Sequence, residues 1–334
     1  MKFLNNQKSL RTFLAAAVFT LAPATALHAQ TDAASYPSGP LTLVVPFSAG
    51  GGVDVVGRIL GEALSKELGK SVVVENKPGA SGMIGAGAVA SAKPDGMTLL
   101  LASSGESAIN PHLYKDMSYD PAKDLAPVTL VAKIPNLITV TAALPVSNLT
   151  EFVAYTKKNS EKMSYSSSGI GNIQNISGEL LNKLLDTSVL HVPYKGSAQA
   201  LADVAGGQVS MTFSSAAAAL PFIQSGKVKA IGVTSEQPMK AFPDVPPLST
   251  NPDLKEFTLV NWFGLFVRAG TPNDIIQKLN AAVVKALKDP SVIKALEAQG
   301  AEPSPMSPAE FTAFRNEQSD LFAQIIKDAG IKIN

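Results

Sequence analysis

The sequence of 334 residues contains no cysteine and only three histidines. The absence of cysteine excludes disulfide bonds, thiolate metal sites, iron–sulfur clusters and a cysteine nucleophile. Charged residues make up only 16% of the chain, and 28 Lys+Arg against 27 Asp+Glu give a formal charge of +1. This balance offers no basic field, so we expect no nucleic-acid partner. With 46% hydrophobic residues, the chain is long and apolar enough for one large or two ordinary folded domains.

The N-terminus has the pattern of an export signal. Three basic residues within the first eleven positions precede a small or apolar run over residues 12–27, which proline interrupts. This run is short for a membrane anchor, and we expect a signal peptide over residues 1–29 with cleavage after Ala29 or, alternatively, Ala26. A lipoprotein would need a cysteine at the cleavage site. An exported chain without cysteine predicts a location in a bacterial periplasm.

Short apolar runs alternate with amphipathic helical patterns along the rest of the chain. The first unit consists of a strand at 41–46, a glycine-rich turn at 47–52 and a helix at 53–68. The same rhythm returns after an extended run broken by Pro135. Repetition of strand, turn and helix predicts an α/β fold, with parallel strands covered by helices on both faces.

The two sets of strands and helices predict two lobes, each a mostly parallel sheet flanked by helices, with a ligand cleft between them. We expect lobe 1 to be discontinuous, formed by residues 36–137 plus 236–334, and lobe 2 to be formed by residues 138–235. Two helices, 273–288 and 308–328, close the chain and are expected to pack back on lobe 1.

The expected ends of the strands are unusually rich in glycine and serine. In open α/β sheets, ligands lie beyond the carboxyl ends of the strands. Glycine lets the backbone approach a ligand, and the N–H groups at a helix N-terminus favour anions. One such turn alone is more often ordinary turn chemistry, but six of them predict a site for a small anion built from dipoles. The six turns are residues 48–52, 79–82, 103–105, 167–172, 194–196 and 214–215.

Several segments resemble catalytic or cofactor-binding motifs but lack a residue that defines the motif. Residues 169–174 lack the third glycine of a dinucleotide-binding turn, and the Gly69-Lys-Ser71 segment lacks the first glycine of a P-loop. No G-x-S-x-G motif occurs. His191 is interpreted as a packed strand residue and His112 as a turn residue, so we expect no catalytic residue, no metal and no cofactor. A secreted α/β hydrolase or transferase that uses a serine-rich turn stays open as an alternative.

A series of short motifs, in a fixed order, covers nearly the whole chain after the expected signal. They are PFSAGGGVD (46–54), VVENKPGA (73–80), PDGMTL (94–99), NPHLY (110–114), YDP (119–121), LAPV (125–128), HVPYKG (191–196) and WFG (262–264). The series resembles the Bug family, the TctC-type extracytoplasmic solute receptors of tripartite tricarboxylate transporters. Motifs this numerous are specific to the family and uninformative about the ligand.

The resemblance implies a type II-like periplasmic binding protein whose two lobes close over a carboxylated solute. The ligand would be a di- or tricarboxylic acid or an aromatic acid. The closed form would deliver it to the membrane permease subunits of a tripartite tricarboxylate transporter. The resemblance implies no enzymatic activity, and we expect a monomer. A periplasmic sensor that presents its ligand to a kinase stays open as a second alternative.

The resemblance also implies which residues bind the ligand. In the family, backbone groups and ordered waters of the first-lobe turns hold one carboxylate, and the second-lobe turns hold the distal end. Carried over to this sequence, the first-lobe residues are Phe47, Ser48, Ala49, Gly50, Ser103, Ser104 and Gly105, and the second-lobe residues are Ser167, Ser168, Gly169, Asn172, Tyr194 and Ser214.

Two positions depart from the family pattern. Many members carry an acidic residue where this sequence has Ser214, and an acid there could pair with a substrate ammonium. Its replacement by serine argues against an amino-acid ligand. Glu106 stands in a first-lobe turn where small or polar residues are usual. We expect its side chain to point to solvent, because a carboxylate facing the cleft would disfavour an anion.

Overall fold

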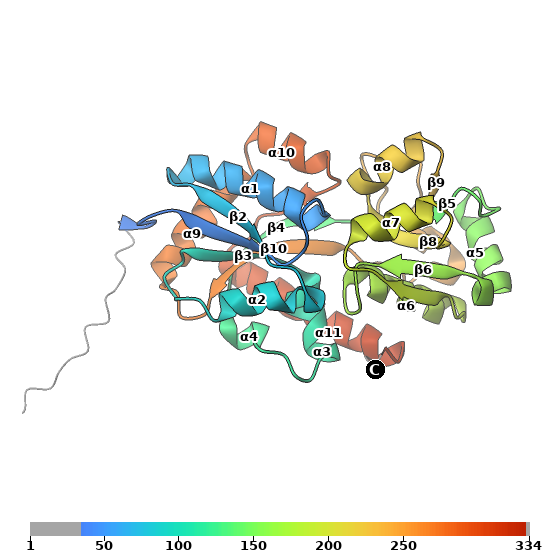
Figure 1. The fold of residues 1–334 in the computed structure, drawn as a ribbon, viewed down its shortest axis with the longest axis horizontal. Helices are drawn as coiled ribbons and strands as arrows, with labels where there is room; N and C mark the ends of the chain where they lie inside the picture. Colours follow the sequence, from blue (N-terminus) through green and yellow to red (C-terminus); the bar gives the residue numbers. More distant parts are fainter. Residues whose placement is uncertain (1–34, 332–334) are drawn as a thin grey trace, which may run out of the picture. The chain divides into compact units, whose positions relative to one another are not determined.

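The structure is a computed structural model that describes residues 35–331, which lie within one compact unit. The expected signal peptide lies outside the described residues. Two β-sheets flanked by helices make up the described part of the chain (Figure 1). None of the described helices combines the length and the hydropathy that crossing a bilayer requires.

The larger sheet has six strands in the order β11-β4-β10-β3-β1-β2. β1 pairs in parallel with β2 and β3, whereas β10 runs antiparallel to β3 and β4, and β11 antiparallel to β4. Most of β3, β4 and β10 is buried, as expected for strands covered on both faces. The strands are Leu41–Val45 (β1), Val72–Asn76 (β2), Thr98–Ser103 (β3), Leu125–Ile134 (β4), Asn261–Arg268 (β10) and Glu302–Pro303 (β11).

Helices cover both faces of this sheet. On one face α1 contacts α9 and α10, and α2 and α11 contact the strands from the other (Figure 1). α1 ends where Gly69 adopts the left-handed φ of 63°, and α11 begins with a capping box between Ser307 and Glu310. The helices are Gly52–Leu68 (α1), Met83–Ala90 (α2), Asn110–Leu113 (α3), Pro121–Asp124 (α4), Asn273–Ala286 (α9), Pro290–Glu297 (α10) and Pro308–Asp328 (α11).

The smaller sheet has five strands in the order β7-β6-β8-β5-β9. α5 and α6 contribute to a hydrophobic cluster that also includes residues of the larger sheet, and α7 and α8 pack against the strands of the smaller sheet through two other clusters. The strands are Asn136–Thr141 (β5), Ser164–Ser167 (β6), Leu190–Pro193 (β7), Met211–Ser215 (β8) and Val228–Val233 (β9). The helices are Leu149–Asn159 (α5), Ile173–Leu185 (α6), Ser197–Ala205 (α7) and Ala216–Gln224 (α8).

The expectation of an α/β fold with two helix-flanked sheets is confirmed, with one correction to the strand directions. Both sheets are mixed rather than mostly parallel. In the smaller sheet β6 pairs in parallel with β7 and β8, but β5 runs antiparallel to β8 and β9. β5 and β10 are each the first strand after the chain has crossed from the other sheet, so both enter their sheet from the opposite end.

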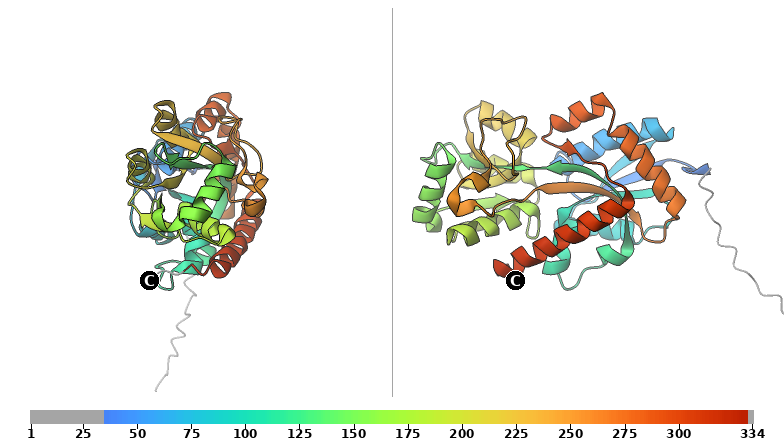
Figure 2. Two further views of the ribbon diagram at one scale, coloured as in Figure 1. Left: turned by 90° about the vertical axis from the view of Figure 1, so that its right-hand side faces the viewer. Right: turned by 180° about the vertical axis from the view of Figure 1, so that it is seen from behind.

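The chain passes between the sheets at two places that lie side by side. β4 leads into β5 across Pro135, and the segment from Thr234 leads back to β10. The Asn136 N–H donates to Thr234 Oγ1 at 2.9 Å, and the Thr234 N–H donates to the Asn136 carbonyl at 2.9 Å. A third link comes from α11, which reaches α6, where Lys183 Nζ donates to the Asp328 carbonyl at 2.6 Å (Figure 2).

Candidate functional site

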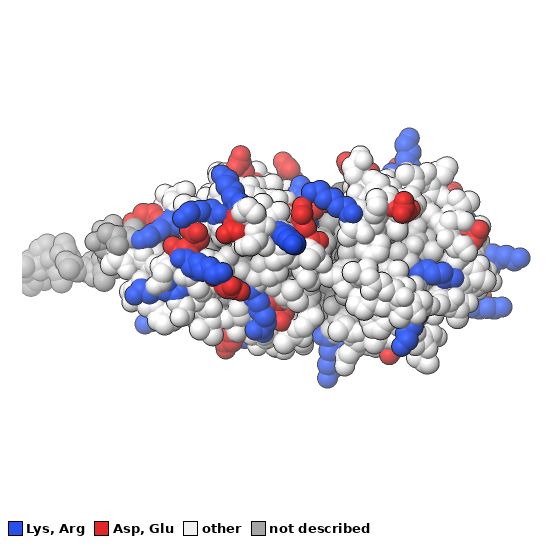
Figure 3. Space-filling model, turned by 90° about the horizontal axis from the view of Figure 1, so that it is seen from above, with Lys and Arg blue, Asp and Glu red and all other residues white. Residues whose placement is uncertain are grey.

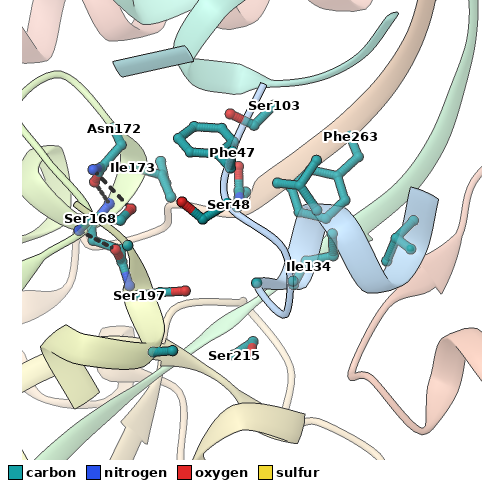
Figure 4. A pocket seen from close by; sticks show the side chains of 18 of the residues that line it. Phe47, Ser48, Ser103, Ile134, Ser168, Asn172, Ile173, Ser197, Ser215 and Phe263 are labelled. Atoms are coloured by element: carbon teal, nitrogen blue, oxygen red, sulfur yellow. Dashed lines mark hydrogen bonds between the residues drawn. The ribbon is translucent and has the colours of Figure 1, made fainter. Parts of the chain in front are cut away.

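A cavity of about 420 Å³ is lined by residues of both sheets (Figure 4). The residues around it come mainly from the loops after β1, β3, β6 and β7. These loops follow the carboxyl ends of their strands, where an α/β sheet usually holds its ligand. Of the thirteen residues that the resemblance assigned to the ligand, six line the cavity: Phe47, Ser48, Ala49, Ser103, Ser168 and Asn172.

Four helices begin at this cavity. Its lining contains Gly52 and Val53 of α1, Ile173 of α6, Ser197 of α7, and Ser215, the N-cap of α8. A helix N-terminus carries partial positive charge, and its first N–H groups have no partner within the helix itself. The arrangement therefore favours an anion.

The loop after β1 is held by a buried carboxylate. Asp54 accepts hydrogen bonds from the Gly50 N–H at 2.9 Å, from Arg58 at 2.9 and 3.0 Å, and from Asn76 at 2.9 Å. Burial opposes ionisation, but the hydrogen bonds from Arg58, Gly50 and Asn76 bring the pKa of Asp54 below its usual value. Asn76 also donates to the Phe47 carbonyl at 3.0 Å. Gly50 is not part of the lining, and its N–H stabilises the loop through Asp54.

The turn after β3 presents one of its two serines to the cavity. Ser103 lines it, whereas Ser104 is buried and donates from Oγ to Asn261 Oδ1 at 3.0 Å. The Gly105 N–H donates to Ser103 Oγ at 3.2 Å. Ser104 and Gly105 therefore lie behind Ser103, and Asn261 of β10 lines the cavity beside it.

Glu106 does not point to solvent, and the expectation for this residue is wrong. Its side chain is fully buried in a one-turn π-helix over Gly105–Ile109, and its Oε2 accepts hydrogen bonds from Ser103 N at 2.7 Å and Ser103 Oγ at 2.8 Å. Burial raises the pKa of Glu106 to about 7, although the hydrogen bonds from Ser103 oppose this. A glutamate in a turn gives no sequence signal for such burial.

The turn after β6 presents its second serine. Ser168 lines the cavity, and its Oγ accepts a hydrogen bond from Asn172 Nδ2 at 3.1 Å (Figure 4). Asn172 also caps α6, accepting from the N–H groups of Gln174 and Asn175 at 3.0 and 3.1 Å. Gly169, whose carbonyl accepts from Asn172 at 2.7 Å, is not part of the lining.

Ser167 lies 2.7 Å from His191 Nε2, a spacing that a serine nucleophile and its base would need. The other contacts of the imidazole contradict this role. Asn175 Nδ2 donates to His191 Nδ1 at 3.4 Å, so the ring proton sits on Nε2 and is donated to Ser167. Burial lowers the pKa of His191 to about 4, and Ser167 is fully buried. Ser167 and His191 therefore stabilise the turn.

Two further residues named from the sequence lie outside the lining. Tyr194 donates from its hydroxyl to Asp203 at 2.5 Å, and this hydrogen bond raises its pKa to about 12. Ser214 Oγ lies 2.6 Å from Thr139 Oγ1 inside the sheet. In both segments a neighbouring residue lines the cavity instead, Lys195 after Tyr194 and Ser215 after Ser214. Successive strand residues point to opposite faces of a sheet, which explains why Ser215 lines the cavity and Ser214 does not.

Sequence reasoning missed several lining residues. Asn136, Asn261 and Phe263 come from the strands next to the crossings, and an apolar or extended pattern does not reveal which side chain meets a cavity. Gln299 and Ala301 come from the segment after α10, a helix that the sequence did not suggest. Ser197 had a signal, since it follows the glycine of the HVPYKG motif.

The lining carries little formal charge. Lys195 is exposed and is the one charged side chain among the described lining residues, which include no aspartate, glutamate or histidine. Apolar side chains of Ile134 and Phe263 lie on one side of the cavity, and Ser168, Asn172 and Ser197 lie on the other (Figure 4). The cavity can therefore hold a molecule with an anionic end and an apolar body.

Comparisons with known proteins agree with this geometry. Residues 56–331 match the model of the tripartite tricarboxylate transporter family receptor. The periplasmic binding protein BugD is 37% identical, with a TM-score of 0.83 over 89% of this chain and 99% of BugD. An R. palustris protein solved with adipate is 32% identical, with a TM-score of 0.85 over 89% of this chain and 99% of that one. MatC from Rhodopseudomonas palustris, solved with bound malate, is 32% identical, with a TM-score of 0.81 over 87% of this chain and all of MatC. The chain belongs to the family of tripartite tricarboxylate transporter receptors, which are solute-binding proteins and not enzymes.

Proposed function

We propose that this protein is a periplasmic receptor that binds a small organic carboxylate between two lobes and delivers it to a tripartite tricarboxylate transporter. One observation carries the proposal: four helix N-termini and Lys195 surround a cavity, and no acidic side chain occurs among the lining residues that the structure describes. Charge-assisted hydrogen bonds to a carboxylate are about twice as strong as neutral ones. A ligand held this way needs no catalytic group.

The distribution of side chains suggests how the ligand lies. One carboxylate would sit beside Ser168 and Ser197, within reach of the ammonium group of Lys195. The apolar body would contact Phe263 and Ile134, and a second polar end would reach Ser103. The bound adipate and malate of two relatives fit this class, since both are dicarboxylates.

The site proposal keeps the residues expected from the sequence but divides their roles. The six that line the cavity would contact the ligand. The others would stabilise the segments around the cavity through the hydrogen bonds described above: Gly50, Ser104, Gly105, Ser167, Gly169, Tyr194 and Ser214.

Closure of the lobes is part of the proposal. Lobe 1 would consist of residues 36–137 plus 236–334, and lobe 2 of residues 138–235. The paired crossings at Asn136 and Thr234 would act as the hinge, because few residues there would absorb the change in backbone angles. A ligand that contacts both lobes stabilises the closed form by its differential affinity.

Location and partners are inferred on the same basis. We infer that residues 1–29 direct export to the periplasm and that the receptor acts as a monomer on membrane permease subunits. The face shown in Figure 3 mixes lysine and arginine with aspartate and glutamate. This face has no continuous region of positive charge of the kind that binds a nucleic acid.

A thermal-shift screen of the mature chain tests the proposal. The panel consists of succinate, adipate, malate, citrate and benzoate, with L-lysine as the expected non-binder, because the lining offers its second ammonium no acidic partner. A carboxylate present at about 100 times its Kd adds about 2.7 kcal/mol to the free energy of unfolding. If none of the five acids raises the melting temperature, the carboxylate receptor is rejected.

The variant Lys195→Met sharpens this test. Loss of a charge-assisted contact costs about 1.5–3 kcal/mol, so the Kd of the best acid should rise about 10- to 100-fold. The matched control is Lys66→Met on α1, which removes an exposed lysine paired with Glu62 and is expected to leave the Kd unchanged. Equal effects of the two variants would remove Lys195 from the site.

A further inference from the structure

Glu106 is a fully buried carboxylate directly behind the cavity. Its Oε2 accepts from both Ser103 N and Ser103 Oγ, while its Oε1 has no hydrogen-bond partner. Ser103 is also part of the cavity lining. One hydroxyl group thus lies between the buried carboxylate and the space proposed for the ligand.

The surroundings of Glu106 contain no compensating cation. Among residues 35–331, no lysine, arginine or histidine forms an ion pair with it. Tyr119 donates to the Glu106 carbonyl at 2.8 Å, and the buried Arg315 donates instead to the Pro121 carbonyl at 2.9 Å. Elements in contact with the π-helix are the 3-10 turn Ala80–Gly82, β3, α3, α4 and α11. Their titratable or charged residues are His112, Lys123, Asp124, Glu310, Arg315, Glu317, Asp320, Lys327 and Asp328.

The absence of a cation gives the carboxyl group two accessible states near neutral pH. Burial raises its pKa to about 7, so both the ionised and the neutral form are populated there. The ionised form binds the Ser103 hydroxyl by a charge-assisted hydrogen bond, whereas the neutral form accepts it more weakly. The ionised form also places a negative charge in a poorly solvated region next to the cavity, which opposes a ligand anion.

We propose that Glu106 is a positioning residue whose protonation makes the Ser103 hydroxyl available to an anionic ligand, so that receptor molecules with an ionised Glu106 take up a proton as they bind a dicarboxylate. This inference rests on the proposed function. The proton comes from solvent and stays on the Glu106 carboxyl group, and no covalent bond of the ligand changes. By linkage, ligand binding favours the neutral form, and the neutral form favours ligand binding.

The ligand-free protein provides the first test. In protein labelled with ¹³C at the glutamate carboxyl carbons, the resonance that is absent from Glu106→Gln belongs to Glu106. It should titrate with a midpoint near 7, and saturating adipate should move that midpoint upward. A midpoint at the ordinary value for glutamate, or one that adipate leaves in place, overturns the proposal.

Calorimetric titration with adipate and with malate between about pH 6 and pH 8.5 provides the second test. The wild-type Kd should rise with pH, approaching tenfold per pH unit above the midpoint. Glu106→Gln preserves the size and the neutral acceptor, so its Kd should be independent of pH and close to the wild-type value at low pH. The control His112→Asn removes another titratable group, on α3, whose pKa burial lowers below its usual value, and should keep the wild-type slope.

The outcomes separate the inference from the proposed function. Binding without a pH slope in the wild type, or a slope that persists in Glu106→Gln, overturns the role of Glu106 and leaves the receptor intact. Absence of binding at every pH in both proteins rejects the carboxylate receptor itself, and the inference with it. A merely structural role for Glu106 would change stability without changing the pH profile of the Kd.

Discussion

The same tripeptide, Ser-Ser-Gly, begins at the last residue of β3 (residues 103–105) and at the last residue of β6 (residues 167–169), yet the two turns present different serines to the cavity. After β3 the first serine lines the cavity and the second donates to Asn261. After β6 the first serine is buried against His191 and the second lines the cavity. Identical sequence and an equivalent place in the sheet therefore do not decide which hydroxyl is functional.

The difference arises from the segment after each turn and from the titratable partner behind it. The first turn continues at once into a π-helix, whereas the second continues through Gly169 and Gly171 with φ values of 132° and 81°. Behind the first lies Glu106 and behind the second His191, and burial shifts both pKa values toward the neutral form. Each turn thus depends on a buried group that loses its charge.

Glycine substitutions beside the two turns should give the largest effects. A Cβ on Gly82, where φ is 86°, would collide with the Glu106 carboxylate, and a Cβ on Gly171 would lie 2.8 Å from Asn110 Oδ1. Left-handed strain and overpacking together should cost about 4 kcal/mol for Gly82→Ala and about 3 kcal/mol for Gly171→Ala. The measurement is the free energy of unfolding in urea.

The control for these substitutions is Gly50→Ala. Gly50 has a similar φ of 83°, but nothing lies within 4 Å of its would-be Cβ. The strain alone should cost about 1 kcal/mol. Equal losses in all three variants would show that backbone conformation, and not the packing behind the turns, limits stability.

Much of the framework behind this comparison could be predicted from the sequence. The glycine- and serine-rich strand ends indicated the loops around the cavity, and the helical pattern over residues 308–328 located α11 at Pro308–Asp328. These features are local, because turn chemistry and helix capping depend on neighbouring residues.

The features that escaped prediction depend on contacts between distant segments. β10 inserts between β3 and β4, which makes the larger sheet mixed, and no local pattern encodes that neighbour. Glu106 is buried because several elements meet over it, although glutamate is rarely buried without a partner. The choice between Ser167 and Ser168 likewise depends on His191, 24 residues further along the chain.

The pH dependence of stability should separate the two buried partners, because their contributions have opposite signs. The pKa of Glu106 rises on folding from 4.5 to about 7, so its contribution is complete below 4.5 and is lost as the pH rises through 7. The loss should be about 3 kcal/mol. The pKa of His191 falls on folding from 6.5 to about 4, so its contribution is present above 6.5 and is lost as the pH falls through 4.

Urea unfolding of the wild type, Glu106→Gln and His191→Gln across this pH range tests the direction of each pH-dependent contribution to the free energy of unfolding. Relative to Glu106→Gln, the wild type should lose stability from about pH 4.5 to 7, and relative to His191→Gln it should lose stability from about pH 6.5 down to 4. A difference between wild type and either variant that stays constant with pH would show that the group keeps its ordinary pKa in the folded protein.

The smallest effects should come from the four serines themselves, and they test the comparison most directly. Ser103→Ala and Ser168→Ala remove hydroxyls that line the cavity, and each should weaken binding of adipate about fivefold, the equivalent of about 1 kcal/mol. Ser104→Ala and Ser167→Ala remove hydroxyls that bond Asn261 and His191, so they should lower the free energy of unfolding by a similar amount and affect the Kd less. The two serines of one turn share the same backbone and receive the same substitution. A general disturbance of that turn would therefore affect both variants equally. The prediction is that the Kd responds mainly to the first serine in the turn after β3 and mainly to the second serine in the turn after β6. Equal effects of the two serines within each turn would contradict it and would show that facing the cavity does not identify the hydroxyl that binds the ligand.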